Sequence, residues 1–424
     1  MKYTENSRSD SRIISSSSRR HVSKSDVIIS RTPISHKIYD VLMKLLFVFE
    51  LLMLIALIVY VTVTELIPIK YIFALVLLLG ISSGVHVWLL SGRRKFTLKR
   101  TVSFVLSILI FSASIFGMSM IGAIHGSLND FDFDKSGVDP QKVKVTKKPF
   151  IVYLSGLDTR NSGEIAEKGL SDVNMIIVVN PQKAKVLMVS IPRDYYVPLW
   201  GEKNKMDKLT HAGKYGIECS METLETLFGI EFNYYAKVNF KSVYDIVNAV
   251  GGITVYSEYN FSSRHSYTEK VYRFVKGPNE LNGDSALAFA RERDSFITGD
   301  RQRGIHQQMV IKAIVEKAIS PAMLKPSKIK SILNAVTSNT KTNFSYDEIS
   351  SLVNYQLDKT PTWDFKTISV DGVGESNYTY TYPRQRLYVM RPDMETVDAA
   401  IREIKIALDE LPDTEVTSSV VSSK

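Results

Sequence analysis

The first third of the chain alternates between long apolar runs and short polar segments. Three apolar runs, residues 45–64, 71–91 and 101–124, contain a single charged side chain among them, Glu50. Each run reaches the roughly 20 apolar helical residues that cross a bilayer. None shows the one-sided pattern of a helix that packs on a soluble core. The pattern therefore predicts three transmembrane helices within residues 38–125.

Basic residues around these runs predict their orientation. Residues 1–37 contain eight Lys or Arg and residues 92–100 contain five, whereas residues 65–70 contain one. Because short loops rich in Lys and Arg stay on the cytoplasmic side, the first two segments are expected in the cytoplasm. An odd number of spans then places everything after about residue 125 outside. The prediction is a multi-pass cell-membrane protein with an extracellular domain.

The formal net charge of +9 is confined to the membrane segment and its tail. Of the 53 basic and 44 acidic residues, 15 and 6 lie within residues 1–125, which leaves 38 of each in the outer domain. The outer domain is thus neutral and lacks the basic excess typical of nucleic-acid binding. The single cysteine, Cys219, allows no internal disulfide.

After the membrane segment, short apolar strands alternate with amphipathic helices, which predicts an α/β sandwich over residues 148–411. Polar segments flank it, namely a disordered tail (1–37), a linker (126–147) and a C-terminal tail (412–424). Strands are expected at 150–158, 173–180, 185–194 and 234–240. Helices are expected at 220–229, 242–251, 301–319, 328–336, 346–357 and 393–411.

The richest candidate chemistry is a segment with four arginines within thirteen residues. Arg291 and Arg293 are two apart and share a face if the segment is extended. Arg303 and Gln307 are four apart and share a face of the predicted helix, which would have Asp300 at its N-cap. Guanidinium groups near a helix N-terminus bind oxyanions. A solvated basic face paired with nearby acidic residues fits the same composition, so both interpretations stay open.

A fifth arginine and two aspartates favour the first interpretation. Arg193 ends one apolar strand, Asp158 ends another, and Asp172 precedes a third. Ligand sites in α/β sheets form at strand ends. Two carboxylates with several arginines indicate Mg²⁺ bridging a diphosphate, although each aspartate alone also fits a turn or cap. His306 fits a helix-surface position.

Several ordered motifs together resemble the LytR-CpsA-Psr family of cell-wall glycopolymer ligases. The resemblance is carried by LSGLDTR (154–160), VSIPRDYY (189–196), LNGDSALAFARERD (281–294) and GDRQRGIHQQ (299–308), among other blocks. Three spans ahead of such a domain are similar to the streptococcal capsule-locus members. The resemblance implies an extracellular α/β(α) sandwich as the catalytic domain.

The resemblance also implies roles for individual residues. The diphosphate of a polyprenyl-linked glycan would be held by Arg193, Arg291, Arg293, Arg303 and Gln307. Mg²⁺, or Mn²⁺ in its place, would be held by Asp158 and Asp172. Asp300 matches a position close to the phosphates and would act in catalysis together with Arg193 and Arg291. The apolar face of residues 235–252 would help line a tunnel for the lipid tail.

The predicted activity is a phosphotransferase at the outer membrane face. It would move a glycopolymer, here capsular polysaccharide, from undecaprenyl diphosphate to peptidoglycan through a phosphodiester. Two alternatives stay open, a polyprenyl diphosphate pyrophosphatase that uses water as acceptor and a non-enzymatic membrane regulator of capsule or cell-wall synthesis. No nucleic-acid partner is expected, because the cytoplasmic tail is short and polar.

Overall fold

The computed structural model describes residues 34–90, 97–129, 143–157, 165–264, 270–297 and 299–413. The chain divides into two compact units, Met1–Phe49 and Glu50–Lys424. The tail predicted over residues 1–37 lies mostly outside the described residues, but its last four residues already belong to a helix. That helix begins directly after Pro33, where a proline suits the start of a helix.

Three long apolar helices open the described chain: α1 Ile34–Thr64, α2 Ile69–Leu90 and α3 Thr97–Asn129. Their parts that are long and apolar enough to cross a membrane are Val41–Thr64, Ile69–Leu89 and Thr101–Ser127. The three predicted helices are therefore present. The predicted linker begins too early, because α3 continues through its first residues, and no proline interrupts the sequence there before Pro140.

Buried polar side chains connect these apolar helices. Glu50 and His86 are 2% and 0% exposed. Ser82 donates a hydrogen bond to Glu50 Oε1 (2.8 Å), and His86 Nε2 lies 2.7 Å from Ser107 Oγ and 3.5 Å from Glu50 Oε2. Polar groups in apolar spans are costly unless they pair. The one charged residue of the apolar runs is therefore part of a hydrogen-bonded contact between helices.

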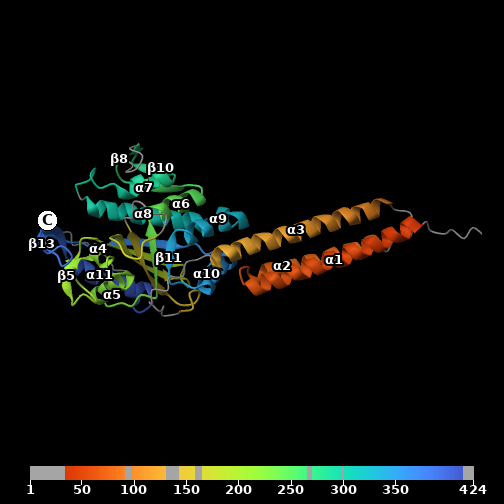
Figure 1. Ribbon diagram of the computed structural model, residues 1–424, viewed down its shortest axis with the longest axis horizontal. Coiled ribbons are helices and arrows are strands. Elements are labelled where there is room, and N and C mark those ends of the chain that lie inside the picture. Colours follow the sequence, from red (N-terminus) through yellow and green to blue (C-terminus); the bar gives the residue numbers. More distant parts are fainter. Residues whose placement is uncertain are drawn as a thin grey trace, which may run out of the picture. The chain divides into compact units, whose positions relative to one another are not determined.

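The domain that follows these helices is built on a six-stranded sheet with the strand order β11-β6-β1-β2-β3-β12 (Figure 1). The pairs β1–β6 and β3–β12 are parallel and the other neighbours are antiparallel. The strands are β1 Phe150–Leu157, β2 Ser171–Asn180, β3 Lys185–Ile191, β6 Tyr234–Asn239, β11 Thr340–Thr342 and β12 Asp364–Ser369. The four strands expected from the sequence form the centre of this sheet.

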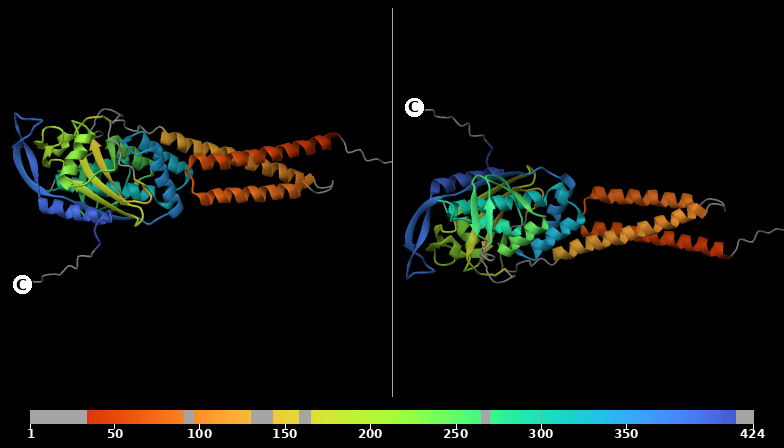
Figure 2. Two further views of the ribbon diagram at one scale, coloured as in Figure 1. Left: turned by 90° about the horizontal axis from the view of Figure 1, so that it is seen from below. Right: turned by 90° about the horizontal axis from the view of Figure 1, so that it is seen from above.

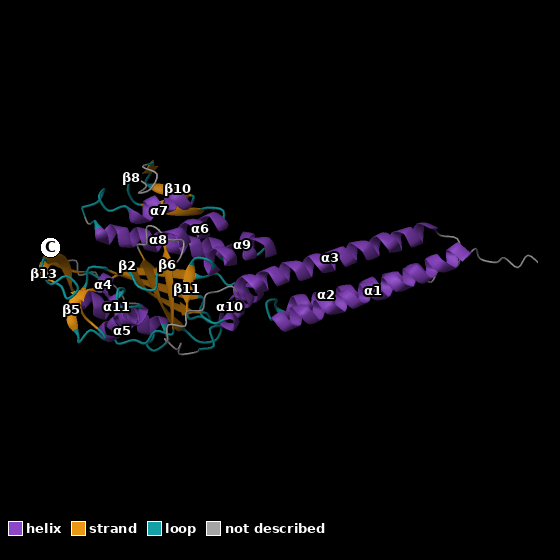
Figure 3. Ribbon diagram, in the orientation of Figure 1, coloured by secondary structure: helices purple, strands orange, loops and turns teal. Residues whose placement is uncertain are grey.

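Helices cover both faces of the sheet (Figures 1 and 3). On one face lie α6 Phe240–Ala249, α7 Gly283–Arg291 and α8 Asp300–Ala318, and on the other lie α4 Leu209–Ala212, α5 Ile217–Phe228 and α11 Met394–Ala407. Successive strand residues point to opposite faces, so Tyr153 packs towards α5 whereas Leu154 and Met188 pack towards α8. Because helices cover both faces, the central strands are apolar along most of their length. The predicted α/β sandwich is confirmed.

Short elements complete the domain around this sandwich. The remaining helices are α9 Pro326–Thr337, α10 Tyr346–Lys359 and a 3₁₀ turn at Pro321–Met323. Small two-stranded sheets pair β4 Tyr196–Leu199 with β5 Lys205–Lys208, β7 Ile253–Ser257 with β10 Gly277–Leu281, and β8 Phe261–Arg264 with β9 Val271–Phe274. The hairpin of β13 Gly372–Tyr378 and β14 Arg386–Pro392 stands at one edge of the domain, in blue in Figure 2. The sequence pattern predicts α9 and α10 but none of these small sheets.

Candidate active site

Arg193 follows β3 and lies among three carboxylates. Its Nη1 is 2.9 Å from Asp172 Oδ1, and its Nε is 3.6 Å from Asp300 Oδ2 and 3.7 Å from Asp194 Oδ2. The last two distances are too long for hydrogen bonds, and among the described residues the buried Nε has no hydrogen-bond acceptor. A buried N–H without an acceptor is costly, so the Nε is available to an oxyanion ligand.

A second guanidinium shares this carboxylate cluster. Arg303 Nη2 lies 2.8 Å from Asp300 Oδ1. Burial lowers the pKa of Arg303, and the positive charge of Arg193 lowers it further against the opposing effect of Asp300. For Arg193, burial alone would lower the pKa, but the carboxylates of Asp172, Asp300 and Asp194 outweigh it and raise the pKa. Both side chains stay charged, and a bound anion would relieve their mutual repulsion.

The start of α8 brings these groups to the sheet. Gly299 precedes the helix with a φ of 41°, and Asp300 is the first helical residue. The predicted N-cap role of Asp300 is therefore wrong, since glycine adopts the left-handed turn that enters the helix and Asp300 instead faces the arginines. Gly304 lets α8 approach β3 closely, because a Cβ there would lie 3.0 Å from Ser190 Oγ.

An arginine pocket results at the ends of β2 and β3. It is lined by Asp172, Arg193, Asp300, Arg303 and Gln307, and further by Arg301, Asp371 and Met390. The predicted shared face of Arg303 and Gln307 on one helix is confirmed. The pocket combines oriented guanidinium groups with a helix N-terminus, which is the arrangement that binds phosphates.

An apolar cavity of about 160 Å³ adjoins the arginine pocket. Both are lined by Asp172 and Gln307. The rest of the cavity wall comes from β1, β2, β6, α6, α7 and α8, with Leu157, Val238, Ile246, Leu287 and Ile311 among its side chains. The predicted apolar lining from residues 235–252 is thus present. An elongated ligand with an anionic part and an apolar part would fit across the two.

Arg291 lies at the apolar cavity rather than in the arginine pocket. It is the last residue of α7 and its guanidinium carbon lies 4.0 Å from the centroid of the Phe240 ring. The expectation of an extended segment here is wrong, because the sequence GDSALAFAR forms a helix that Asn282 caps. Arg293 follows the helix end, is half exposed and pairs with Asp294 at 3.1 Å. Arg293 therefore does not line the pocket with Arg303.

The two predicted metal ligands have different outcomes. Asp172 lines both the arginine pocket and the apolar cavity, whereas Asp158 lies outside the described residues. Within the described part of the chain, no group of three or more His, Cys, Asp or Glu side chains could hold a metal ion. Mg²⁺ is usually held by one or two carboxylates together with substrate phosphates. The Asp172 carboxylate fits that donor chemistry beside a phosphate pocket.

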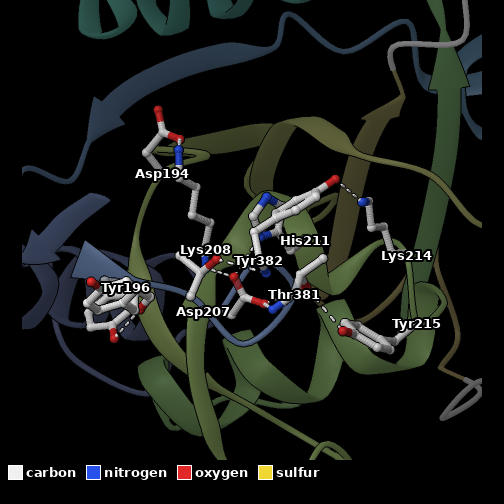
Figure 4. A network of polar contacts seen from close by, with 11 residues as sticks. Asp194, Tyr196, Asp207, Lys208, His211, Lys214, Tyr215, Thr381 and Tyr382 are labelled. Carbon is white, nitrogen blue, oxygen red and sulfur yellow. Dashed lines mark hydrogen bonds and ion pairs between the residues drawn. The ribbon is translucent and has the colours of Figure 1, made fainter. Parts of the chain in front are cut away.

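A polar network behind the pocket was not expected from the sequence (Figure 4). Lys208 Nζ donates to Asp194 Oδ1 at 2.8 Å. Its neighbour Asp207 accepts from His211 Nδ1 (2.5 Å) and from the backbone N–H of Thr381 (2.7 Å). Burial opposes ionisation of Asp207, but these hydrogen bonds outweigh it and lower its pKa. The network fixes the loop that carries Asp194 beside Arg193.

His306 is a core residue, so the helix-surface position that the sequence allowed is not the one it occupies. It is 1% exposed, its Nδ1 lies 3.2 Å from Phe289 O, and its ring stacks on Phe261. Burial lowers the pKa of His306 to about 4. His306 is buried because it lies on the face of α8 that packs against α7 and β8.

This buried histidine predicts a pH dependence of stability. A histidine in the unfolded chain has a pKa near 6.5. Between about pH 6.5 and 4, the unfolded chain therefore binds a proton that the folded chain does not. The free energy of unfolding falls as the pH falls through this range, by up to about 3 kcal/mol. In His306→Gln we expect a smaller loss of stability between pH 7 and 4.5. Urea unfolding of both proteins at the two pH values measures it. An equal loss in both would contradict a neutral His306.

The fold and the pocket define a class of protein: an α/β domain that follows three apolar helices and has an arginine-lined pocket next to an apolar cavity. Such a site suits a lipid-linked phosphate. The model of the LytR_cpsA_psr family matches residues 123–396, more than half of the chain, and the chain therefore belongs to this family.

Individual relatives agree with this assignment. The polyisoprenyl-teichoic acid–peptidoglycan teichoic acid transferase TagU of Bacillus mycoides (strain KBAB4) is 34% identical over 252 residues, which are 58% of this chain and 78% of the relative. The crystal structure of B. subtilis TagV superposes with a TM-score of 0.51 at 28% identity, covering 63% of this chain and 99% of TagV. A structure of TagT bound to LI-WTA superposes with a TM-score of 0.50 at 25% identity, covering 63% and 94%. The family resemblance seen in the motifs is confirmed.

Proposed function

We propose that this protein transfers a polyprenyl-diphosphate-linked glycopolymer, a capsular polysaccharide carried on undecaprenyl diphosphate, to peptidoglycan. Membership of the family makes the chain a glycopolymer transferase. One observation carries the proposal: the arginine pocket and the apolar cavity lie side by side and share Asp172 and Gln307 as lining residues. A donor with a diphosphate and a polyprenyl tail fits two adjoining sites of this kind. The Lys and Arg asymmetry around the spans supports an outward-facing domain.

The pocket residues supply the chemistry of phosphoryl transfer. Arg193 and Arg303 would neutralise the diphosphate oxygens, and Arg291 would hold the phosphate nearest the apolar cavity. Mg²⁺, held by Asp172 and Asp158, would supply further charge neutralisation when bound. Phosphoryl transfer depends mostly on positioning and electrostatic stabilisation, so no protein nucleophile is needed.

The bond changes follow from this arrangement. A sugar hydroxyl of peptidoglycan attacks the glycan-side phosphorus, a new O–P bond forms, and the bond to the lipid phosphate oxygen breaks. The lipid phosphate leaves with the bonding electrons, and the hydroxyl proton passes to a carboxylate. Asp300 would receive it, because its carboxylate lies between Arg193 and Arg303.

The test uses the full chain in lipid nanodiscs with a short lipid-linked glycan as donor and soluble peptidoglycan fragments as acceptor. We expect a glycan–peptidoglycan conjugate and one equivalent of lipid phosphate. Glycan phosphate released equally with and without the fragments would show water as the acceptor and support the pyrophosphatase alternative. No consumption of donor under either condition would refute an enzymatic role.

A further inference from the structure

The hairpin β13–β14 is fixed to the wall of the arginine pocket. Met390 on β14 lines the pocket, and its backbone N–H donates to Asp194 O at 2.7 Å. Asp371, directly before β13, also lines the pocket and pairs with Arg301 at the start of α8. The base of the hairpin is therefore continuous with the proposed diphosphate site, and its strands extend away from it.

The strand register defines one face of this hairpin. Gly374 lies opposite Met390, Ser376 opposite Tyr388, and Tyr378 opposite Arg386. Residues directly opposite each other, and residues two apart on one strand, share a face. The hairpin face thus comprises Gly374, Ser376, Tyr378, Arg386, Tyr388 and Met390. Its two tyrosines are 55% (Tyr378) and 53% (Tyr388) exposed, so aromatic surface extends from the pocket into solvent.

The Tyr388 side chain lies over Gly374, which belongs to the next pair of residues along the hairpin. A Cβ on Gly374 would come within 2.7 Å of the Tyr388 hydroxyl and 2.8 Å of its ring, so the absent side chain leaves room for the ring. Partial burial raises the pKa of Tyr388, and the carboxylates of Asp194 and Asp300 raise it further. The phenol is therefore within the electrostatic field of the pocket. Arg386 is held on the same face by its hydrogen bond to Ser376 O, at 2.6 Å.

We propose that the hairpin face binds the acceptor, an amino-sugar polymer that carries carboxylate-bearing peptides. This inference rests on the proposed function. Tyrosine rings offer rigid flat surfaces with a hydroxyl at the edge, which suits the C–H face and hydroxyl groups of a sugar. Arg386 provides a cation for the acceptor's carboxylates.

The geometry of in-line displacement favours the acceptor, rather than the donor glycan, as the ligand of the hairpin face. The attacking and leaving oxygens stand on opposite sides of the transferred phosphorus. The leaving lipid phosphate belongs to the apolar cavity, which Arg291 borders, whereas Met390 and Asp371 line only the arginine pocket. The attacking hydroxyl therefore enters from the side of the hairpin.

The experiment measures binding and transfer separately with the full chain in nanodiscs. Calorimetry gives the affinity for soluble peptidoglycan fragments of several disaccharides and, independently, for the lipid-linked donor. In Tyr388→Ala we expect the fragment affinity to fall about tenfold and the acceptor KM to rise about as much, with donor affinity unchanged. Gly374→Ala should act in the same direction by displacing the ring. Tyr256→Ala is the matched control, because Tyr256 is 68% exposed on β7, away from the hairpin.

Each outcome decides the proposal. Weaker donor binding in Tyr388→Ala would assign the hairpin face to the donor glycan and overturn the inference. Unchanged fragment affinity in both Tyr388→Ala and Tyr378→Ala, or no binding of fragments to the wild-type chain, would overturn it as well. Fragment binding that depends on Tyr388 without any conjugate formed would uphold the acceptor site and refute the proposed transfer instead.

Discussion

Arg193→Ala is expected to reduce glycopolymer transfer on the order of 10³-fold in kcat/KM, the scale seen when one preorganised charge-stabilising donor is lost. The reason is the position of the guanidinium, which lies among Asp172, Asp194 and Asp300 with an Nε that has no acceptor among the described residues. Removing it takes away a donor to the transferred phosphate and leaves three carboxylates facing the negative diphosphate. Product formation with the nanodisc-embedded chain measures the effect.

Two variants separate chemistry from folding in this test. Arg193→Lys keeps the positive charge but loses the planar fork, so we expect only partial recovery of transfer together with a thermal midpoint near that of the wild type. Arg402→Ala removes an exposed arginine on α11, on the opposite face of the sheet, and should leave transfer unchanged. Transfer by Arg193→Ala at the wild-type rate would refute the assignment of the diphosphate to this pocket.

Local patterns were enough to predict the central sheet and the membrane helices. Long apolar runs have few other interpretations, and strands buried on both faces are equally distinctive. The shared face of Arg303 and Gln307 in the arginine pocket followed from helical spacing alone. Arg193 and Asp172 were predicted near strand ends. The structure has Arg193 two residues after β3 and Asp172 as the second residue of β2, and it brings them within 2.9 Å of each other.

Other features depend on contacts that no local pattern records. Helix α7 was missed because its alanine-rich segment is short and is buried on nearly all sides, so it has no continuous solvent-exposed face, and this error placed Arg293 on the wrong face. Asp371 enters the pocket through the parallel pairing of β12 with β3, a contact between residues nearly 180 positions apart. Met390 enters it through a separate bridge between β14 and Tyr195. The burial of His306 required the packing of α7 and β8 around it, which its own helix does not reveal.

Arg291→Ala is expected to reduce transfer about 10²-fold, for a different reason from Arg193. The Arg291 guanidinium stands over the Phe240 ring at 4.0 Å, at the apolar cavity that would hold the polyprenyl tail. From there it meets the phosphate that leaves with the lipid, where negative charge develops as the bond breaks. We therefore expect kcat to fall more than donor affinity, because the interaction strengthens in the transition state.

Phe240→Leu tests how Arg291 is held in place. The substitution keeps an apolar side chain at the cavity but removes the ring beneath the guanidinium, a cation–π contact of about 1 kcal/mol. Transfer should fall roughly fivefold, far less than in Arg291→Ala. In the double variant Arg291→Ala/Phe240→Leu, the loss should match that of Arg291→Ala alone, because the ring then has no guanidinium to position. Fully additive losses would show that Phe240 acts on the lipid tail rather than through Arg291.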